Sequence, residues 1–127
     1  MKVVALDYGS ARTGVAVSDP TGTLARPLGV VEGASAEDGL RRLVELVEAE
    51  QPERVVVGLP LTLRGERGAQ AAETERFIEH LTRELQVPVE PFDERFTTAL
   101  AGPGGDDARA AAHLLASYLE WSRNRQP

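Results

Sequence analysis

The chain has 127 residues, with 14 basic and 20 acidic side chains and therefore a formal net charge of −6. This length suits one domain with its own hydrophobic core, and we expect a single domain over residues 1–127. The lack of cysteine excludes a disulfide framework, a thiolate nucleophile and a cysteine zinc site. No segment has the apolar length of a signal peptide or a membrane span, so we expect a cytoplasmic protein.

The negative charge argues against simple electrostatic binding of nucleic acid, because an acidic surface repels phosphate at long range. Every basic residue except Lys2 is an arginine, however. The guanidinium fork of arginine is the better bidentate ligand for phosphate. Phosphate binding should therefore depend on where a few arginines stand in the fold.

The first part of the chain predicts three short strands joined by turns. Apolar and β-branched residues run from Lys2 to Asp7 and return over 15–17 after a glycine-bounded turn. A third strand is expected over 28–31, with Pro27 before it. Short loops between successive strands favour an antiparallel meander.

Beyond residue 34 the pattern alternates helices and strands. A helix begins near Ser35, its expected N-cap, and ends before Pro52. After it we expect a strand buried on both faces (54–58), a helix (69–85) with Ala72, Phe77, Ile78 and Leu81 inward, an edge strand (87–92) and a final helix (107–121). The order β-β-β-α-β-α-β-α predicts an α/β fold, with a five-stranded mixed sheet and helices on both faces.

Acidic side chains stand where these elements end or begin. Asp7 ends the first strand, Asp93 and Glu94 end the fifth, and Asp107 begins the last helix. Functional groups of α/β sheets gather at the carboxyl ends of strands, where these carboxylates could converge. Crowded carboxylates cannot all stay ionised alone, and oxygen ligands of this kind suit Mg²⁺ or Mn²⁺. Two such ions can activate a water and stabilise the leaving oxygen of a phosphodiester.

Each acid also has a purely structural interpretation. Asp7 precedes a glycine turn and could form that turn. Asp93 and Glu94 could cap a short helix over 95–100, and Asp107 has the place of a helix N-cap. The residues taken singly leave these alternatives open.

Four segments carry a further signal: residues 7–19 (DYGSARTGVAVSD), 57–61 (VGLPL), 93–98 (DERFTT) and the helix from 107. In this order they resemble the four motifs of the YqgF/RuvX family, which belongs to the ribonuclease H-like superfamily. The resemblance covers nearly the whole chain. It implies a ribonuclease H-like fold and a divalent-metal nuclease, either resolving Holliday junctions or trimming the precursor of 16S ribosomal RNA.

By motif position, the resemblance implies that Asp7, Asp93, Glu94 and Asp107 are catalytic. Neighbours on a strand face opposite sides, so which acid of the Asp93–Glu94 pair faces the metal stays open. We assign Asp7, Glu94 and Asp107 as the ligands of Mg²⁺ or Mn²⁺. Precursor rRNA or branched DNA would be the partner. A junction resolvase should be a homodimer because it makes paired symmetric cuts, whereas a trimming nuclease has no such requirement.

Candidates for substrate binding surround these acids: Gly9, Arg12, Arg64, Arg67, Arg95 and Thr97. Gly9 and Gly14 could give a tight turn that lets a phosphate approach the backbone, or form a plain hairpin. Arg95 could bind phosphate, or hold one of the neighbouring acids in place. Thr97 could instead hydrogen-bond locally.

Two departures from the family pattern affect substrate contacts. The segment 99–106 is short, contains Gly-Pro-Gly-Gly and has no basic residue, and the loop after Leu61 reads Thr-Leu-Arg-Gly where the family often has Asn and Asp. A nucleic-acid-binding module that has lost catalysis is therefore a second hypothesis. A fragment of a sugar-kinase or actin-like ATPase is a third, because its phosphate loop also begins Asp-x-Gly. One domain of this size cannot clasp ATP between two, which disfavours it.

Overall fold

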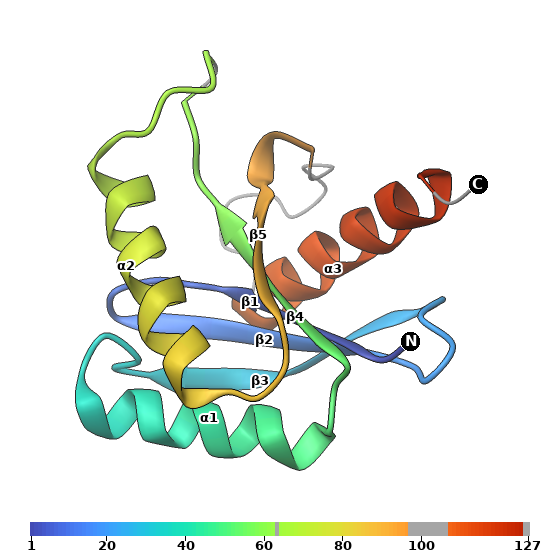
Figure 1. Cartoon of the computed structure of the whole chain (residues 1–127), viewed down its shortest axis with the longest axis horizontal. Helices are drawn as coiled ribbons and strands as arrows, with labels where there is room; N and C mark the ends of the chain where they lie inside the picture. Colours follow the sequence, from blue (N-terminus) through green and yellow to red (C-terminus); the bar gives the residue numbers. More distant parts are fainter. Residues whose placement is uncertain (63, 97–106, 126–127) are drawn as a thin grey trace.

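Five strands form one mixed sheet in a computed structural model that describes residues 1–62, 64–96 and 107–125 (Figure 1). In chain order the elements are β1 (Val3–Asp7), β2 (Arg12–Ser18), β3 (Ala25–Glu32), α1 (Glu37–Glu50), β4 (Arg54–Leu59), α2 (Ala69–Glu84), β5 (Val89–Asp93), the short 3₁₀ helix η1 (Glu94–Phe96) and α3 (Asp107–Asn124). The predicted α/β class and element order are confirmed.

The strand order β3-β2-β1-β4-β5 sets where the sheet is parallel. β1, β2 and β3 form the expected antiparallel meander, whereas β4 pairs parallel to β1 and β5 pairs parallel to β4. The carboxyl ends of β1, β4 and β5 therefore share one edge of the sheet. Asp7, Leu59 and Asp93 are the last residues of these three strands.

Helices cover both faces of the sheet, with α1 and α2 on one side and α3 on the other (Figure 1). The alternation along β1 shows why. Val4 and Leu6 pack into the cluster that contains α1 and α2 residues, and Val3 and Ala5 into the cluster with α3. All four are buried, so β1 must lie in the middle of the sheet with both faces covered.

Three local expectations are corrected by the structure. Pro27 lies inside β3, which tolerates it because an edge strand needs fewer backbone donors. Ala36, not Ser35, is the N-cap of α1, and the Ser35 hydroxyl donates to the Ser10 carbonyl at 3.2 Å. In α2 the fully buried alanine is Ala71, whereas Ala72 is half-buried.

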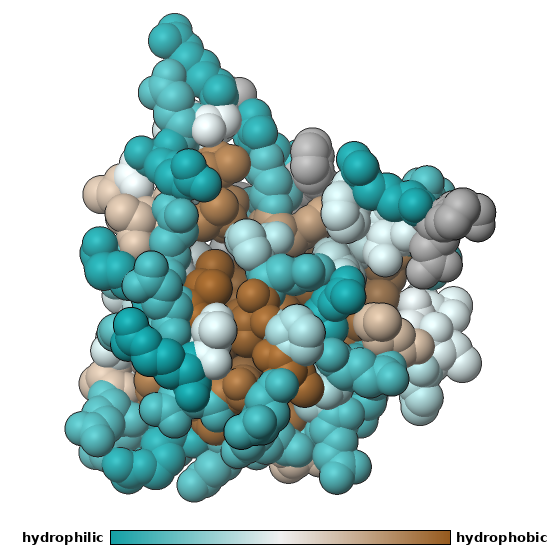
Figure 2. Space-filling view, viewed as in Figure 1, coloured by the Kyte–Doolittle hydropathy of each residue, from teal (hydrophilic) through white to brown (hydrophobic). Residues whose placement is uncertain are grey.

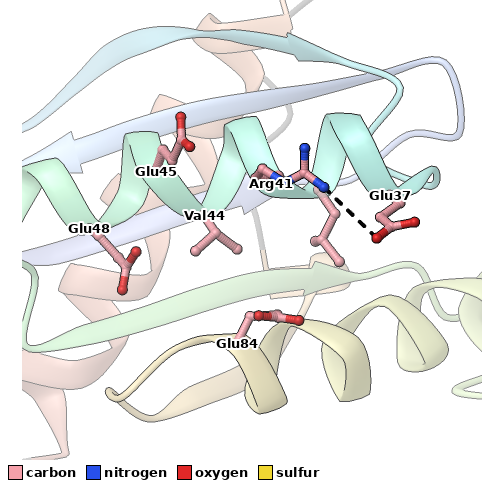
Figure 3. A pocket seen from close by; sticks show the side chains of 7 residues that line it. Glu37, Arg41, Val44, Glu45, Glu48 and Glu84 are labelled. Carbon is pink, nitrogen blue, oxygen red and sulfur yellow. Dashed lines mark ion pairs between the residues drawn. The ribbon is translucent and has the colours of Figure 1, made fainter.

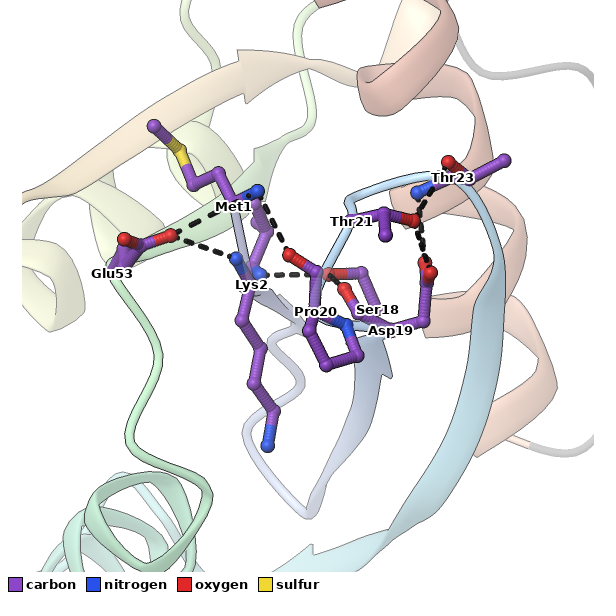
Figure 4. Close-up of polar contacts among 9 residues, drawn as sticks. Met1, Lys2, Ser18, Asp19, Pro20, Thr21, Thr23 and Glu53 are labelled. Atoms are coloured by element: carbon purple, nitrogen blue, oxygen red, sulfur yellow. Dashed lines mark hydrogen bonds and ion pairs between the residues drawn. The ribbon is translucent and has the colours of Figure 1, made fainter.

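The N-terminus is fixed against the β2–β3 turn (Figure 4). The Met1 ammonium donates to the Pro20 carbonyl at 2.9 Å, and the Val3 amide donates to the Ser18 hydroxyl at 2.8 Å. Asp19 accepts the Thr23 amide at 2.8 Å and also a bond from Thr21. Hydrogen bonds from Thr21 and the turn backbone hold the pKa of Asp19 well below its usual range. Asp19, the last residue of the first motif, is thus a turn former.

The face that carries α1 and α2 is apolar at its centre and polar around it (Figure 2). Half-buried hydrophobic residues pack against the cluster on this side, among them Ile78, Val87 and Val89. Within the described ranges, no helix is long and apolar enough to cross a membrane.

Candidate active site

Asp7 is placed by β1 at the edge where parallel strands end. It pairs with Gly14 of the antiparallel neighbour β2, so its backbone position is fixed on one side by the sheet. The side chain is half-buried, and this burial raises the pKa of the Asp7 carboxyl. Repulsion from Asp107 raises the pKa further. The structure therefore brings the ends of β1 and α3 within electrostatic contact.

Gly14 is the reason that α3 can approach so closely. A Cβ atom built on Gly14 would lie 1.9 Å from the carbonyl oxygen of Asp107 and 3.1 Å from the amide nitrogen of Ala108. Only glycine leaves room for that backbone. Gly14 lies in β2 and is not among the glycines with positive φ, so its expected role in a tight turn is wrong. Its role is to let the first turn of α3 lie against the sheet beside Asp7.

Glu94 reaches the same region from the end of β5. A Cβ atom on Gly58 of β4 would lie 2.7 Å from the Glu94 Oε1 atom and 3.1 Å from Leu114 Cδ2 of α3. The carboxylate therefore lies over Gly58 on the α3 side of the sheet. Burial, followed by repulsion from Asp7 and Asp93, raises the pKa of Glu94 to about 7.

Asp93 has the opposite environment from its neighbour. Its Oδ2 atom accepts from Arg95 Nη2 at 2.6 Å, and its Oδ1 atom accepts the Arg95 amide at 2.9 Å. The hydrogen bonds from Arg95 hold the pKa of Asp93 below its usual value. The Arg95 amide contact lets Asp93 cap the short helix η1, as its structural interpretation predicts, although residues 97–100 of the expected helix lie outside the described residues. The structure therefore gives Asp93 and Glu94 different environments, which the sequence alone does not distinguish.

Asp107 is held by a basic side chain rather than by another acid. Its Oδ2 atom lies 3.1 Å from Arg12 Nε at the start of β2. Across the described ranges no ion pair involves Asp7 or Glu94, and no three acidic or histidine side chains lie close enough together to hold a metal ion. Asp7 interacts electrostatically with Asp107 and with Glu94, whereas the Asp107 carboxylate pairs with Arg12.

Of the other residues predicted to bind substrate, Arg64 and Arg67 lie in the loop between β4 and α2. Arg67 pairs with Glu75 of α2 at 3.1 Å, and Arg64 is exposed. Arg95 lies over this loop, because a Cβ atom on Gly65 would be 3.2 Å from its Nη1 atom. Gly9 lies in the β1–β2 turn, where a Cβ atom would be 2.5 Å from the Arg12 carbonyl oxygen. Thr97 and the segment 99–106 lie outside the described residues.

A separate acidic groove lies between α1 and α2, on the side of the sheet opposite α3 (Figure 3). Its cavity of about 300 Å³ is lined by Glu37, Leu40, Arg41, Val44, Glu45, Glu48 and Glu84. Arg41 points to Glu37, 3.8 Å away. Because glutamates dominate this groove, it repels phosphate and is no continuation of the site at the strand ends.

The sequence alone does not predict that Gly58 leaves room for the Glu94 carboxylate. A lone glycine within a buried strand is a known signal of close approach by another group, and the run Val55–Leu59 contains one. That signal says that something approaches the strand. It does not say that a carboxylate from the next strand does.

The sequence model of the RuvX family, described as Holliday junction resolvase, matches residues 1–121. A relative from Chloroflexus aggregans, named "Putative pre-16S rRNA nuclease", is 44% identical over 96% of this chain and 95% of its own. A relative of the same name from Chloroflexus aurantiacus is 46% identical over 78% of this chain and 65% of its own. The chain thus spans just under two thirds of that second protein.

Solved structures resemble the fold at much lower sequence identity. The RuvC protein of T. thermophilus, solved with a Holliday junction substrate, matches with a TM-score of 0.66 at 18% identity, over 98% of this chain and 96% of its own. The Holliday junction resolvase of fowlpox virus matches with a TM-score of 0.57 at 13% identity, over 95% of this chain and 99% of its own. At these identities the likeness shows a shared fold.

Proposed function

Because this chain belongs to the RuvX family, we propose that it is a divalent-metal-dependent nuclease that hydrolyses phosphodiester bonds in the precursor of 16S ribosomal RNA. The observation that carries this proposal is the pair Asp7 and Glu94. Both are half-buried carboxyls at one edge of the sheet, and repulsion between them adds to the effect of burial on the pKa of Glu94. A group whose pKa is raised as far as that of Glu94, in such a place, is typical of catalytic sites.

The donor set fits a hard divalent cation. Asp7, Glu94 and Asp107 offer only oxygen atoms, which Mg²⁺ and Mn²⁺ prefer. Burial raises the pKa values of Asp7 and Glu94 most, and a cation between these carboxylates would remove the repulsion that raises them further. When bound, such an ion supplies Lewis-acid polarisation of the phosphate and activation of a water. These three residues would hold it.

The remaining residues of the site position these ligands. Arg95 neutralises Asp93, which leaves Glu94 as the ionisable group of the pair that faces Asp7. Arg12 holds Asp107 at 3.1 Å, so this ion pair has to open before the carboxylate can turn toward Asp7. Once released, the Arg12 guanidinium can bind a substrate phosphate through its paired N–H donors. Arg12 would thus release the Asp107 carboxylate and bind a substrate phosphate in its place.

The choice of substrate rests on the relatives. The two relatives from Chloroflexus carry the name "Putative pre-16S rRNA nuclease", which favours RNA trimming. Resolution of Holliday junctions is the second candidate, favoured by the family description and by the RuvC likeness, and it would require a homodimer. Because the chain carries a net charge of −6, we expect binding in either case to be weak, sensitive to salt and dependent on the cation.

A cleavage assay tests this function. Purified protein is incubated with Mg²⁺ or Mn²⁺ and labelled precursor rRNA, single-stranded RNA or a four-way DNA junction. We expect the precursor to be cut, cutting to stop in EDTA, and Asp7→Asn to be inactive. Asp38→Asn is the matched control, since that carboxylate is exposed on α1. Failure of the wild type on every substrate, or equal cleavage by both variants, would contradict the proposal.

A further inference from the structure

A second cavity lies on the other side of the β1–β2 turn from the acids. Its volume is about 240 Å³, and its lining residues are Tyr8, Ala34, Ser35, Glu73, Arg76, Phe77 and His80. Tyr8 directly follows Asp7, and successive side chains near the end of a strand project to opposite faces of the sheet. Tyr8 and Phe77 belong to the α1–α2 side, whereas Asp7 interacts with Asp107 of α3. One turn therefore separates the cavity from the candidate active site.

That turn is fixed rather than free. The Gly33 amide donates to the Ala11 carbonyl at 3.0 Å, and the Ser35 hydroxyl donates to the Ser10 carbonyl at 3.2 Å. The start of α1 is thus tied to the loop that follows Asp7. A substrate strand that passes over this loop would have a phosphate on the Asp7 side and a neighbouring base on the cavity side.

The wall of the cavity combines an aromatic surface with polar groups. The rings of Tyr8 and Phe77 stack with their centroids 4.2 Å apart and their planes 20° apart. The Tyr8 hydroxyl donates to Glu73 Oε1 at 3.4 Å, which orients the carboxylate beside the aromatic pair. Arg76 and His80 follow on the same stretch of α2 at helical spacing and add hydrogen-bond donors.

We propose that this cavity binds an unpaired nucleobase of the substrate strand, and that guanine is the base it fits best. The proposal rests on the proposed nuclease function. Unpaired bases are recognised by aromatic surfaces together with hydrogen bonds to their Watson–Crick edges. Guanine presents two adjacent N–H donors on that edge, which the Glu73 carboxylate can accept together. Its O6 and N7 acceptors suit the donors of Arg76 and His80.

Size and charge favour a base over the other parts of a nucleic acid. At about 240 Å³ the cavity is smaller than the roughly 300–1,000 Å³ of sites for drug-sized ligands, so it suits one ring system. The Glu73 carboxylate beside Tyr8 disfavours a phosphate, whose charge has the same sign. Cytosine and uracil each lack the adjacent pair of N–H donors.

Nucleotide titration of the ¹⁵N-labelled full chain tests the proposal. The titration is done in EDTA with the 5′-monophosphates of guanosine, adenosine, cytidine and uridine, and with inorganic phosphate. We expect the guanosine nucleotide to shift the amide signals of the cavity residues and to bind at least about fivefold more tightly than the pyrimidine nucleotides. Phosphate alone should leave these signals in place.

Two glutamate variants of α2 separate base recognition from a general charge effect. Glu73→Gln should remove the preference for guanosine. Glu79→Gln removes the same charge from an exposed residue of the same helix and should keep the preference. The proposal is overturned if no nucleotide shifts these signals, if phosphate alone shifts them, or if Glu73→Gln keeps the preference. The titration in EDTA measures base binding without cleavage. A failure of base binding is therefore distinguished from a failure of the proposed nuclease activity.

Discussion

Two acidic regions of the molecule place their carboxylates in different ways. At the carboxyl ends of β1 and β5, Asp7 and Glu94 are half-buried, and repulsion between them contributes to the raised pKa of Glu94. In the α1–α2 groove the glutamates project into water, and the Glu37 side chain is 90% exposed beside Arg41. Both regions are rich in negative charge. Burial without a basic partner, rather than the amount of charge, distinguishes the candidate active site.

The largest expected effect separates these two regions by activity. Glu94→Gln keeps the shape of the side chain but removes a ligand charge, and should lower kcat on precursor rRNA by about 10²–10³-fold. Glu45→Gln, the same change in the groove, should leave kcat unchanged. Asp93→Asn should have a smaller effect than Glu94→Gln, because Arg95 already neutralises Asp93. Equal losses of kcat in Glu94→Gln and Glu45→Gln would show that the strand-end acids have no special part in catalysis.

The next effect concerns the contact that brings α3 to the site. Gly14→Ala places a methyl group against the Asp107 carbonyl, so we expect a loss of about 1–3 kcal/mol in the free energy of unfolding, measured by urea denaturation. Gly29→Ala is the matched control in β3, where a Cβ atom meets nothing within 4 Å. Its effect should stay within about 0.5 kcal/mol. A neutral Gly14→Ala would mean that α3 does not lie this close to β2.

A smaller effect is the dependence of stability on pH. The pKa of Glu94 is raised from 4.5 to about 7 in the folded protein. Between these values the folded state holds a proton that the unfolded state releases, so the contribution of Glu94 to stability is fully present below about pH 4.5 and is lost as the pH rises through 7. Because Glu94 is partly exposed, we expect this fall to be about 1–2 kcal/mol.

Urea denaturation in EDTA at about pH 5 and about pH 8 measures this fall. Glu94→Gln should flatten it, and Mg²⁺ at the higher pH should restore stability to the wild type by binding the ionised form. Glu45→Gln should change neither result. If the stability of the wild type instead rises from pH 5 to pH 8, ionisation of Glu94 does not destabilise the folded protein.

The smallest expected effect lies in the groove. Arg41 pairs with Glu37 at 3.8 Å and with Asp38 at 3.5 Å, and all three side chains are exposed. Arg41→Ala should therefore change the free energy of unfolding by less than about 1 kcal/mol, and less again at high salt. A larger loss, measured by the same denaturation method, would show that the groove stabilises the fold in a way that its geometry does not suggest.

The sequence predicts the elements of this fold well because their signals are local. Periodicity and breaking residues located each strand and helix, and acids at strand ends indicated the edge that carries the site. Contacts between distant segments could not be predicted in this way. Gly14 and Gly58 have similar sequence surroundings to other strand glycines, and only the packing of α3 and Glu94 against them explains them. The choice between Asp93 and Glu94 likewise depends on where Arg95 lies.

Small errors at element ends have the same origin. Ser35 has the residue type of an N-cap but bonds to Ser10 in the β1–β2 turn, and Ala36 takes the capping position. Pro27 marks a strand boundary by its local preference, yet the edge position of β3 lets the strand continue through it. In both cases tertiary context outweighed local preference.

Calorimetric titration with Mn²⁺ tests most directly the claim that Asp7, Glu94 and Asp107 form one cation site. We expect the wild type and Glu45→Gln to bind the ion with the same affinity, and Asp7→Asn, Glu94→Gln and Asp107→Asn each to weaken it by on the order of tenfold or more. The titration needs no substrate, so it is independent of which nucleic acid is cleaved. Unchanged Mn²⁺ binding in Asp7→Asn and Glu94→Gln would contradict the account.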